Sequence, residues 1–301
     1  MSLPIHIPFR LRFHLASARH QPAFGILLRI PTISTFIILF LCASRTAAAT
    51  LSSECQVVNH TAVALLAGER PTEVESRLSQ FILQLGSSTN AKLCLAVTFG
   101  NLAIALERTG KLDAAEQAAR RSAKLFEETL GPNAPELCYP LRTLSQVMNQ
   151  KGHYREAWKL LTRVEALPPA TPSDLAVNHG LGAILLEEKG ELAEAELEYR
   201  KSISAWERLG RGASPEILPE LGNLASFYIK KRRIPEALTL LERALRITET
   251  VPCDTNIRVG MLAMLAFAHS LHKDDAEAEK YFRQGIDLLD SLPPAARAQT
   301  G

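Results

Sequence analysis

Apolar residues recur along most of this chain at the three- and four-residue spacing of amphipathic helices. Each such stripe forms one face of a helix, which must be buried against a neighbouring element. The pattern therefore predicts an all-α protein. Three stripes with the same spacing are Phe99, Leu102 and Leu106, then Leu141, Leu144 and Met148, then Leu221, Leu224 and Tyr228.

The predicted helices come in pairs that repeat along the chain. The strings GKLDAAE, GHYREAW, GELAEAE, RRIPEAL and KDDAEAE each begin with a turn residue and carry an alanine five positions later. Gly suits the end of a first helix because a left-handed backbone costs it little, and the small Ala suits a close approach of two helices. The alanines are Ala115, Ala157, Ala195, Ala237 and Ala278, separated by 42, 38, 42 and 41 residues.

Prolines mark the predicted starts of the first helices. Pro135, Pro172 and Pro215 each lie just ahead of an apolar stripe, where the missing N–H has no cost. The preceding Thr171 and Ser214 are expected to act as N-caps through their hydroxyl groups.

These features together resemble the tetratricopeptide repeat family, and the period near 42 resembles its kinesin light chain variety. FGNLAIALERTGKLDAAEQAARRSAKLFEETLGPNAPEL and LGNLASFYIKKRRIPEALTLLERALRITET are similar to such units. The resemblance covers residues 91–290 in five units and implies a right-handed superhelical solenoid of antiparallel helix pairs. The fifth unit is degenerate, with Asp275 in place of an apolar residue, as expected of a terminal repeat whose outer face meets water.

The segments on either side of the five units have different patterns. Residues 50–90 predict an N-terminal helical pair broken by Gly68 and Pro71, which is either a sixth, eroded repeat or a cap. Residues 291–301 (SLPPAARAQTG) predict a disordered tail.

Residues 1–49 predict a signal peptide or an N-terminal membrane anchor. Ile30 to Ala43 is an apolar, uncharged run that follows basic residues and is short for a membrane span. Three alanines at positions 47–49 offer a cleavage site after Ala49, whereas the long leader and Arg45 leave an uncleaved anchor formed by residues 30–43 as the alternative. In both cases the repeats are expected to be exported, either periplasmic or secreted.

The charge distribution does not indicate nucleic acid as a partner. The 301-residue chain has a formal net charge of +2, but residues 1–49 hold five arginines and no acidic residue. Without them, 29 basic residues face 32 acidic ones, and the basic run at 230–233 falls in a predicted turn. A nucleic-acid site would need a basic face.

Four cysteines follow the leader, and the sequence leaves their state open. They are Cys55, Cys94, Cys138 and Cys253, which allow three pairings, and no C-x-x-C motif is present. Free buried thiols are slightly favoured over disulfides.

No catalytic or cofactor-binding motif is present. The chain lacks a P-loop, G-x-S-x-G, H-E-x-x-H and a dinucleotide-binding glycine pattern. His269 and His272 have a spacing compatible with a shared metal but lack matching acidic or Cys ligands. We therefore expect neither an enzyme nor a cofactor or metal site.

The resemblance also implies a binding face. In this family the first helix of each unit lines the concave side, and an Asn on it often hydrogen-bonds the backbone of a bound peptide. This column holds Asn101 and Asn223, and helical projection places Arg142, Gln146 and Asn149 on the same face of the second unit. The alternative is that the two asparagines stabilise neighbouring helices or face solvent.

Taken together, the sequence predicts a non-catalytic scaffold that binds a peptide or partner helix on the concave face. A second hypothesis is a membrane-anchored envelope assembly factor or chaperone-like holder. The sequence predicts neither the identity of the partner nor the oligomeric state.

Overall fold

The computed structural model describes residues 51–67, 70–85, 89–169, 171–251, 253 and 255–291. Within these residues the chain forms helices and no strands. The helices are α3 (Ser53–Ala67), α4 (Pro71–Gln84), α5 (Thr89–Arg108), α6 (Leu112–Leu130), α7 (Cys138–Gln150), α8 (Tyr154–Glu165), α9 (Asp174–Lys189), α10 (Leu192–Arg208), α11 (Leu218–Lys230), α12 (Ile234–Thr250), α13 (Thr255–His272) and α14 (Asp275–Asp290), with short 3-10 turns η3 (Pro135–Leu137) and η4 (Pro215–Ile217).

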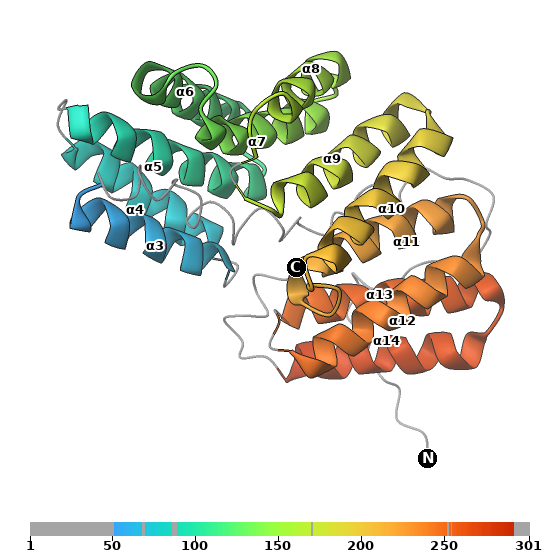
Figure 1. The fold of residues 1–301 in the computed structure, drawn as a ribbon. Helices are drawn as coiled ribbons and strands as arrows, with labels where there is room; N and C mark the ends of the chain where they lie inside the picture. The colour runs from blue at the N-terminus through green and yellow to red at the C-terminus, as the bar shows by residue number, and fades with distance from the viewer. Residues whose placement is uncertain are drawn as a thin grey trace.

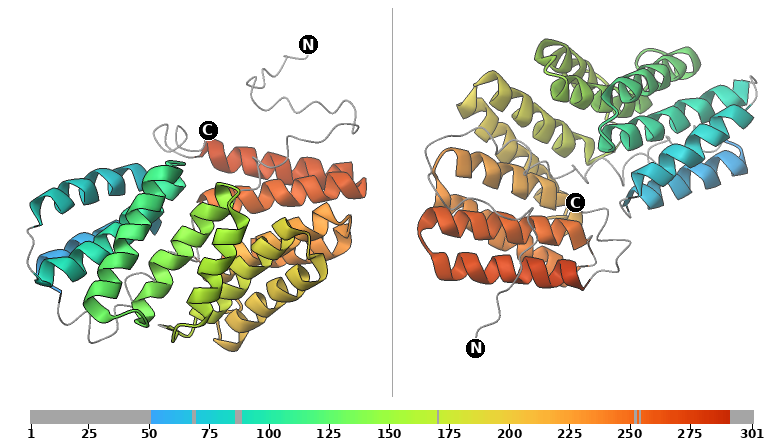
Figure 2. Two further views of the ribbon diagram at one scale, coloured as in Figure 1. Left: turned by 90° about the horizontal axis from the view of Figure 1, so that it is seen from above. Right: turned by 180° about the vertical axis from the view of Figure 1, so that it is seen from behind.

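Consecutive helices pack as antiparallel pairs, and the pairs follow one another around an arc (Figures 1 and 2). The first pair is α3 with α4 and the last is α13 with α14. One continuous apolar core runs through the array, because each pair buries one face against its partner helix and another against the next pair. The predicted all-α solenoid of helix pairs is confirmed.

The repeated turn-and-alanine pattern has the predicted geometry. Ala115, Ala157, Ala195 and Ala237 are fully buried where the two helices of a pair meet. The turn glycines Gly110, Gly152 and Gly190 have φ angles of 75°, 79° and 86°. At the equivalent turn positions Arg232 and Lys273 adopt the same left-handed conformation, with φ of 61° and 65°.

The helix starts differ from the prediction in their capping. Pro135 and Pro215 open the 3-10 turns η3 and η4, which lead into α7 and α11. Ser214 occupies the cap position of η4, but its hydroxyl donates to the carbonyl of Arg211 and caps no helix N–H. The cap position of α9 is taken by Ser173, so the N-cap roles expected for Thr171 and Ser214 were wrong.

The last pair exposes apolar surface that inner pairs bury. In one column of the second helices, Leu161, Tyr199 and Leu241 are buried, because the first helix of the next pair covers each of them. Phe282, in the same column of α14, is 45% exposed. Among the described residues no helix follows α14, which accounts for the difference.

The predicted leader, residues 1–49, lies outside the described residues, as does the predicted tail, residues 291–301, except for Ser291. Within the described part of the chain, no helix combines the length and apolar character needed to cross a membrane.

Candidate peptide-binding face

The first helices of successive pairs lie next to one another along the arc. The contacts α3–α5, α5–α7, α7–α9 and α11–α13 join first helices directly, whereas the second helices pack mainly against first helices. From α3 to α9, and again from α11 to α13, the first helices therefore form one side of the array, and α6 and α8 lie on the outer side (Figure 1). All five predicted site residues are on first helices: Asn101 on α5, Arg142, Gln146 and Asn149 on α7, and Asn223 on α11.

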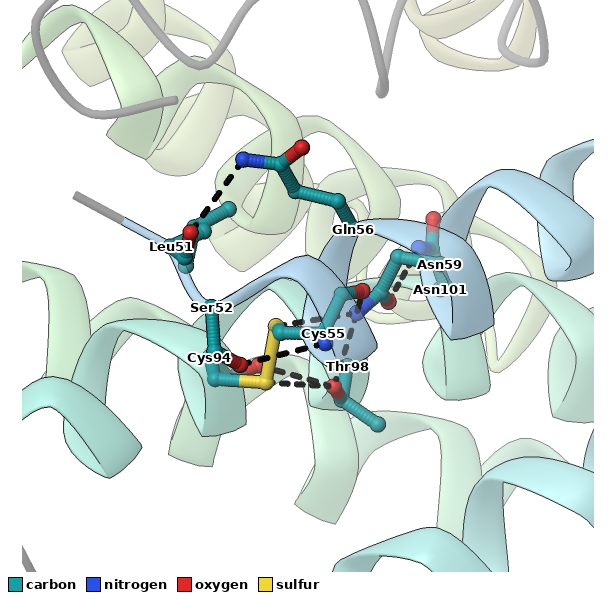
Figure 3. The surroundings of a disulfide bond; sticks show 8 residues. All are labelled: Leu51, Ser52, Cys55, Gln56, Asn59, Cys94, Thr98 and Asn101. Atoms are coloured by element: carbon teal, nitrogen blue, oxygen red, sulfur yellow. Dashed lines mark hydrogen bonds between the residues drawn. A yellow bond between two sulfur atoms is a disulfide. The ribbon is translucent and has the colours of Figure 1, made fainter. Parts of the chain in front are cut away.

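Asn101 is fully buried and bonded to the preceding pair (Figure 3). Its Nδ2 donates to Oδ1 of Asn59, 2.8 Å away on α3. Asn59 in turn donates to the hydroxyl of Thr98 at 3.1 Å and to the carbonyl of Cys55 at 3.0 Å. Because buried amides need partners, this network fixes α3 against α5. Asn101 thus has a structural role, which is the alternative left open for it.

A disulfide bond closes the same junction. Cys55 of α3 and Cys94 of α5 are bonded, and both residues are buried (Figure 3). The expectation of free buried thiols was wrong for this pair. Cys138 and Cys253 are not disulfide-bonded.

Arg142 is also buried and holds α7 against α9. Its Nη2 donates to Oδ1 of Asp174 at 2.7 Å, and its Nη1 lies 3.5 Å from Oδ1 of Asn178. Burial alone would lower the pKa of Arg142, but the nearby Cys138 and Asp174 outweigh that effect, and the net pKa is raised. The guanidinium is therefore permanently charged and is neutralised within the protein.

The other three residues are half-buried. Gln146 lies one helical turn from Arg142 on α7, and Asn149 lies a further three residues along. The Oδ1 atom of Asn149 is buried without a hydrogen-bond partner among the described residues. Asn223 is on α11, and α9 lies between it and the α7 residues in chain order. The chain thus brings Arg142, Gln146 and Asn149 together on one helix, and their binding role stays a prediction.

Sequence reasoning did not identify the partners of the buried polar residues. Asn59 precedes Asn101 by 42 residues, which is the repeat period, so the period was the available signal. A shift of one 42-residue period from Cys94 leads to Ser52 in the preceding pair, and Cys55 lies about one helical turn after that position. No comparable signal identified Asp174, because it follows a linker and lies within the shortened interval of 38 residues between Ala157 and Ala195.

Two models of the tetratricopeptide repeat match the sequence, one over residues 94–170 and one over residues 221–251. No curated protein matches the chain.

Similar solved structures show the fold. BtubC (BKLC) from P. vanneervenii is 16% identical, with a TM-score of 0.55, covering 80% of this chain and 92% of that chain. A Podosopora anserina putative kinesin light chain with nearly identical TPR-like repeats is 20% identical, with a TM-score of 0.50, covering 64% and 92%. The APC/C hetero-tetramer Cut9-Hcn1 is 14% identical, with a TM-score of 0.50, covering 83% and 49%.

Proposed function

Since this chain belongs to the tetratricopeptide repeat family, we propose that it is a non-catalytic scaffold that binds a peptide segment or helix of a partner protein along its first helices. The observation that carries the proposal is the repeat array itself, because stacked helix pairs present several parallel helices to one extended ligand. The sequence has no catalytic motif, and since a fold does not by itself determine function, the non-catalytic role is part of the proposal.

The proposed contacts come from the half-buried amides. Gln146, Asn149 and Asn223 lie on first helices, and an amide can donate to and accept from a peptide backbone at once. Asn101 and Arg142 contribute by holding α5 and α7 in place, since each donates a hydrogen bond to a neighbouring first helix.

Export to an oxidising compartment is part of the proposal. It rests on the apolar run of residues 30–43 and on the alanines that follow it. The Cys55–Cys94 disulfide supports it, because such bonds persist outside the cytosol and are rare within it. The second candidate, a membrane-anchored assembly factor or chaperone-like holder, differs in retaining residues 30–43. If the intact mass of the recovered protein corresponds to a chain that starts at Thr50, the soluble scaffold is favoured. If it corresponds to a chain that starts at Met1 and the protein is in the membrane fraction, the anchored form is favoured.

Binding can be tested with a displayed library of peptides of about 12 residues, long enough to span several first helices. Peptides selected by the wild-type protein are expected to bind a Gln146→Ala/Asn223→Ala variant at least about tenfold more weakly. The matched control is Asn133→Ala/Gln284→Ala, which removes one exposed amide from a loop and one from α14. Equal affinity for all three proteins would place binding elsewhere, and failure to select any peptide would contradict the scaffold function.

A further inference from the structure

A second surface with binding chemistry lies on the outer side of the array, on α8. It consists of Tyr154, Arg155, Trp158 and Lys159 and is called here the α8 outer face. Tyr154 and Trp158 are 43% and 39% exposed, and both basic side chains are exposed. The opposite side of α8 packs into the core through Ala157, Leu161 and Val164.

Trp158 interrupts a series of ion pairs that joins neighbouring helix pairs. At the equivalent positions Glu116 of α6 bonds to Lys151 at 2.7 Å, and Glu196 of α10 bonds to Arg233 at 2.7 Å. On α8 the same position holds Trp158, and the amine of Lys189 lies 6.0 Å from the centre of its ring. The indole therefore replaces a carboxylate that would have neutralised this part of the surface.

The positive charge on this face is uncompensated. Among the described residues neither Arg155 nor Lys159 forms an ion pair. Other basic residues on the second helices do form ion pairs, as Arg120 does with Glu156 and Arg243 does with Glu207. Arg155 and Trp158 are three residues apart and so are neighbours on the helix surface. Two aromatic rings thus lie beside two unpaired cations.

We propose that the α8 outer face docks an acidic amphipathic helix of a partner protein. Apolar side chains of that helix would cover the two rings, and its carboxylates would pair with Arg155 and Lys159. Trp, Tyr and Arg are the residues that dominate binding energy at protein interfaces, and opposite charge steers the encounter. This surface is distinct from the first-helix face, so the inference does not depend on the proposed function.

The exposure of the rings favours a protein partner over a membrane. A helix that binds lipid needs a broad apolar face that enters the acyl region. Here Tyr154 and Trp158 are each more than half covered by the protein, and they are the only two aromatic residues of the α8 outer face. An acidic amphipathic helix can bind without inserting into an apolar layer, because it contacts the two rings and also forms ion pairs with Arg155 and Lys159.

The test uses the full chain and a fluorescein-labelled acidic peptide of about 15 residues with Leu at helical spacing among Glu residues. Anisotropy is expected to show saturable binding that weakens with added salt. Trp158→Ala should weaken binding about tenfold, and Arg155→Glu/Lys159→Glu should weaken it further and remove the salt dependence. Because Trp206 is buried, protection of Trp fluorescence from acrylamide on binding would report on Trp158 alone.

Matched controls separate this face from general surface effects. Phe282→Ala removes an exposed ring from α14, and Arg208→Glu/Arg246→Glu reverses two exposed, unpaired charges on other helices. Both controls should bind the acidic peptide as the wild type does, and a peptide with Lys in place of Glu should not bind. Helical circular dichroism and unfolding midpoints confirm that each variant is folded.

Three results would overturn the proposal. They are the absence of saturable peptide binding, an equal loss of binding in the control variants, and a Trp158-dependent association with phosphatidylglycerol vesicles in place of the peptide.

Discussion

At the scale of single residues, polar side chains in this protein connect one helix pair to the next. The Asn59–Asn101 bond joins equivalent positions of successive first helices, 42 residues apart. The sequence predicted the column in which Asn101 lies but not its burial. Asn101 is buried because α3 of the N-terminal pair packs against α5 in register with the repeats. This register could not be predicted, because the N-terminal pair lacks the turn-and-alanine pattern that identified the other units.

The buried amide pair gives a first prediction. Asn59→Ala removes the acceptor for Asn101 and the donor to Thr98, leaving buried polar groups without partners. We expect a loss of about 1–3 kcal/mol in the free energy of unfolding. Asn223→Ala, at a half-buried position, should change it by less than about 0.5 kcal/mol. Urea unfolding followed by circular dichroism measures both, and similar losses would contradict the structural role of Asn59.

The turn residues give a second prediction at the same scale. Arg232 has a φ of 61°, a conformation that costs a residue with a Cβ roughly 1–2 kcal/mol. Arg232→Gly should therefore raise the free energy of unfolding by about 0.5–1 kcal/mol, after the entropy that Gly loses on folding. The opposite change, Gly152→Ala, should lower it, although an added Cβ would meet no atom within 4 Å. Thermal and urea unfolding of the two variants should move in opposite directions.

At the scale of helices, the junction between α7 and α9 departs from the repeat. The spacing from Ala157 to Ala195 is four residues shorter than most others, and a buried Arg142–Asp174 pair lies at this junction. Helical projection predicted that Arg142 shares a face of α7 with Gln146 and Asn149. It could not show that α9 covers Arg142, because the position of Asp174 depends on how the linker after α8 folds.

The junction gives a third prediction, in the form of a double-mutant cycle. Arg142→Met leaves the Asp174 carboxylate buried without its cation, and we expect a loss of about 3–5 kcal/mol in the free energy of unfolding. Adding Asp174→Leu removes the unpaired charge and should restore much of that stability. If the double variant is as unstable as the sum of the single variants, the two side chains are not coupled and the ion pair does not hold the junction.

At the scale of the whole molecule, the array is nearly one-dimensional, since each pair contacts mainly its neighbours. This is why so much of the fold could be predicted: buried alanines and left-handed turns repeat in each of the five units after the N-terminal pair, and local pattern decides local structure. The disulfide and the polar contacts between pairs could not be predicted in the same way. They depend on the register between units, which no single unit encodes.

The same one-dimensional architecture gives the last prediction, which concerns the disulfide. Cys55 and Cys94 are 39 residues apart and tie the first pair, α3–α4, to α5. Cys55→Ala/Cys94→Ala should lower stability by about 2–4 kcal/mol, because the unfolded chain regains the freedom that the cross-link removes. The loss should be local: hydrogen exchange should accelerate in α3 and α4 while protection in α9 to α12 is retained.

Reduction provides the matched experiment. A thiol reductant should reproduce this exchange pattern in the wild type and leave the Cys55→Ala/Cys94→Ala variant unchanged, whereas Cys253→Ala should behave as the wild type. Faster exchange spread evenly over all helices would mean that the array unfolds as one cooperative unit, in contradiction to the prediction. A local response would mean that the first pair, α3–α4, is held firmly against α5 only in an oxidising environment. The hydrogen bond between Asn101 and Asn59 would then be stable only in the kind of compartment to which the leader is proposed to direct the protein.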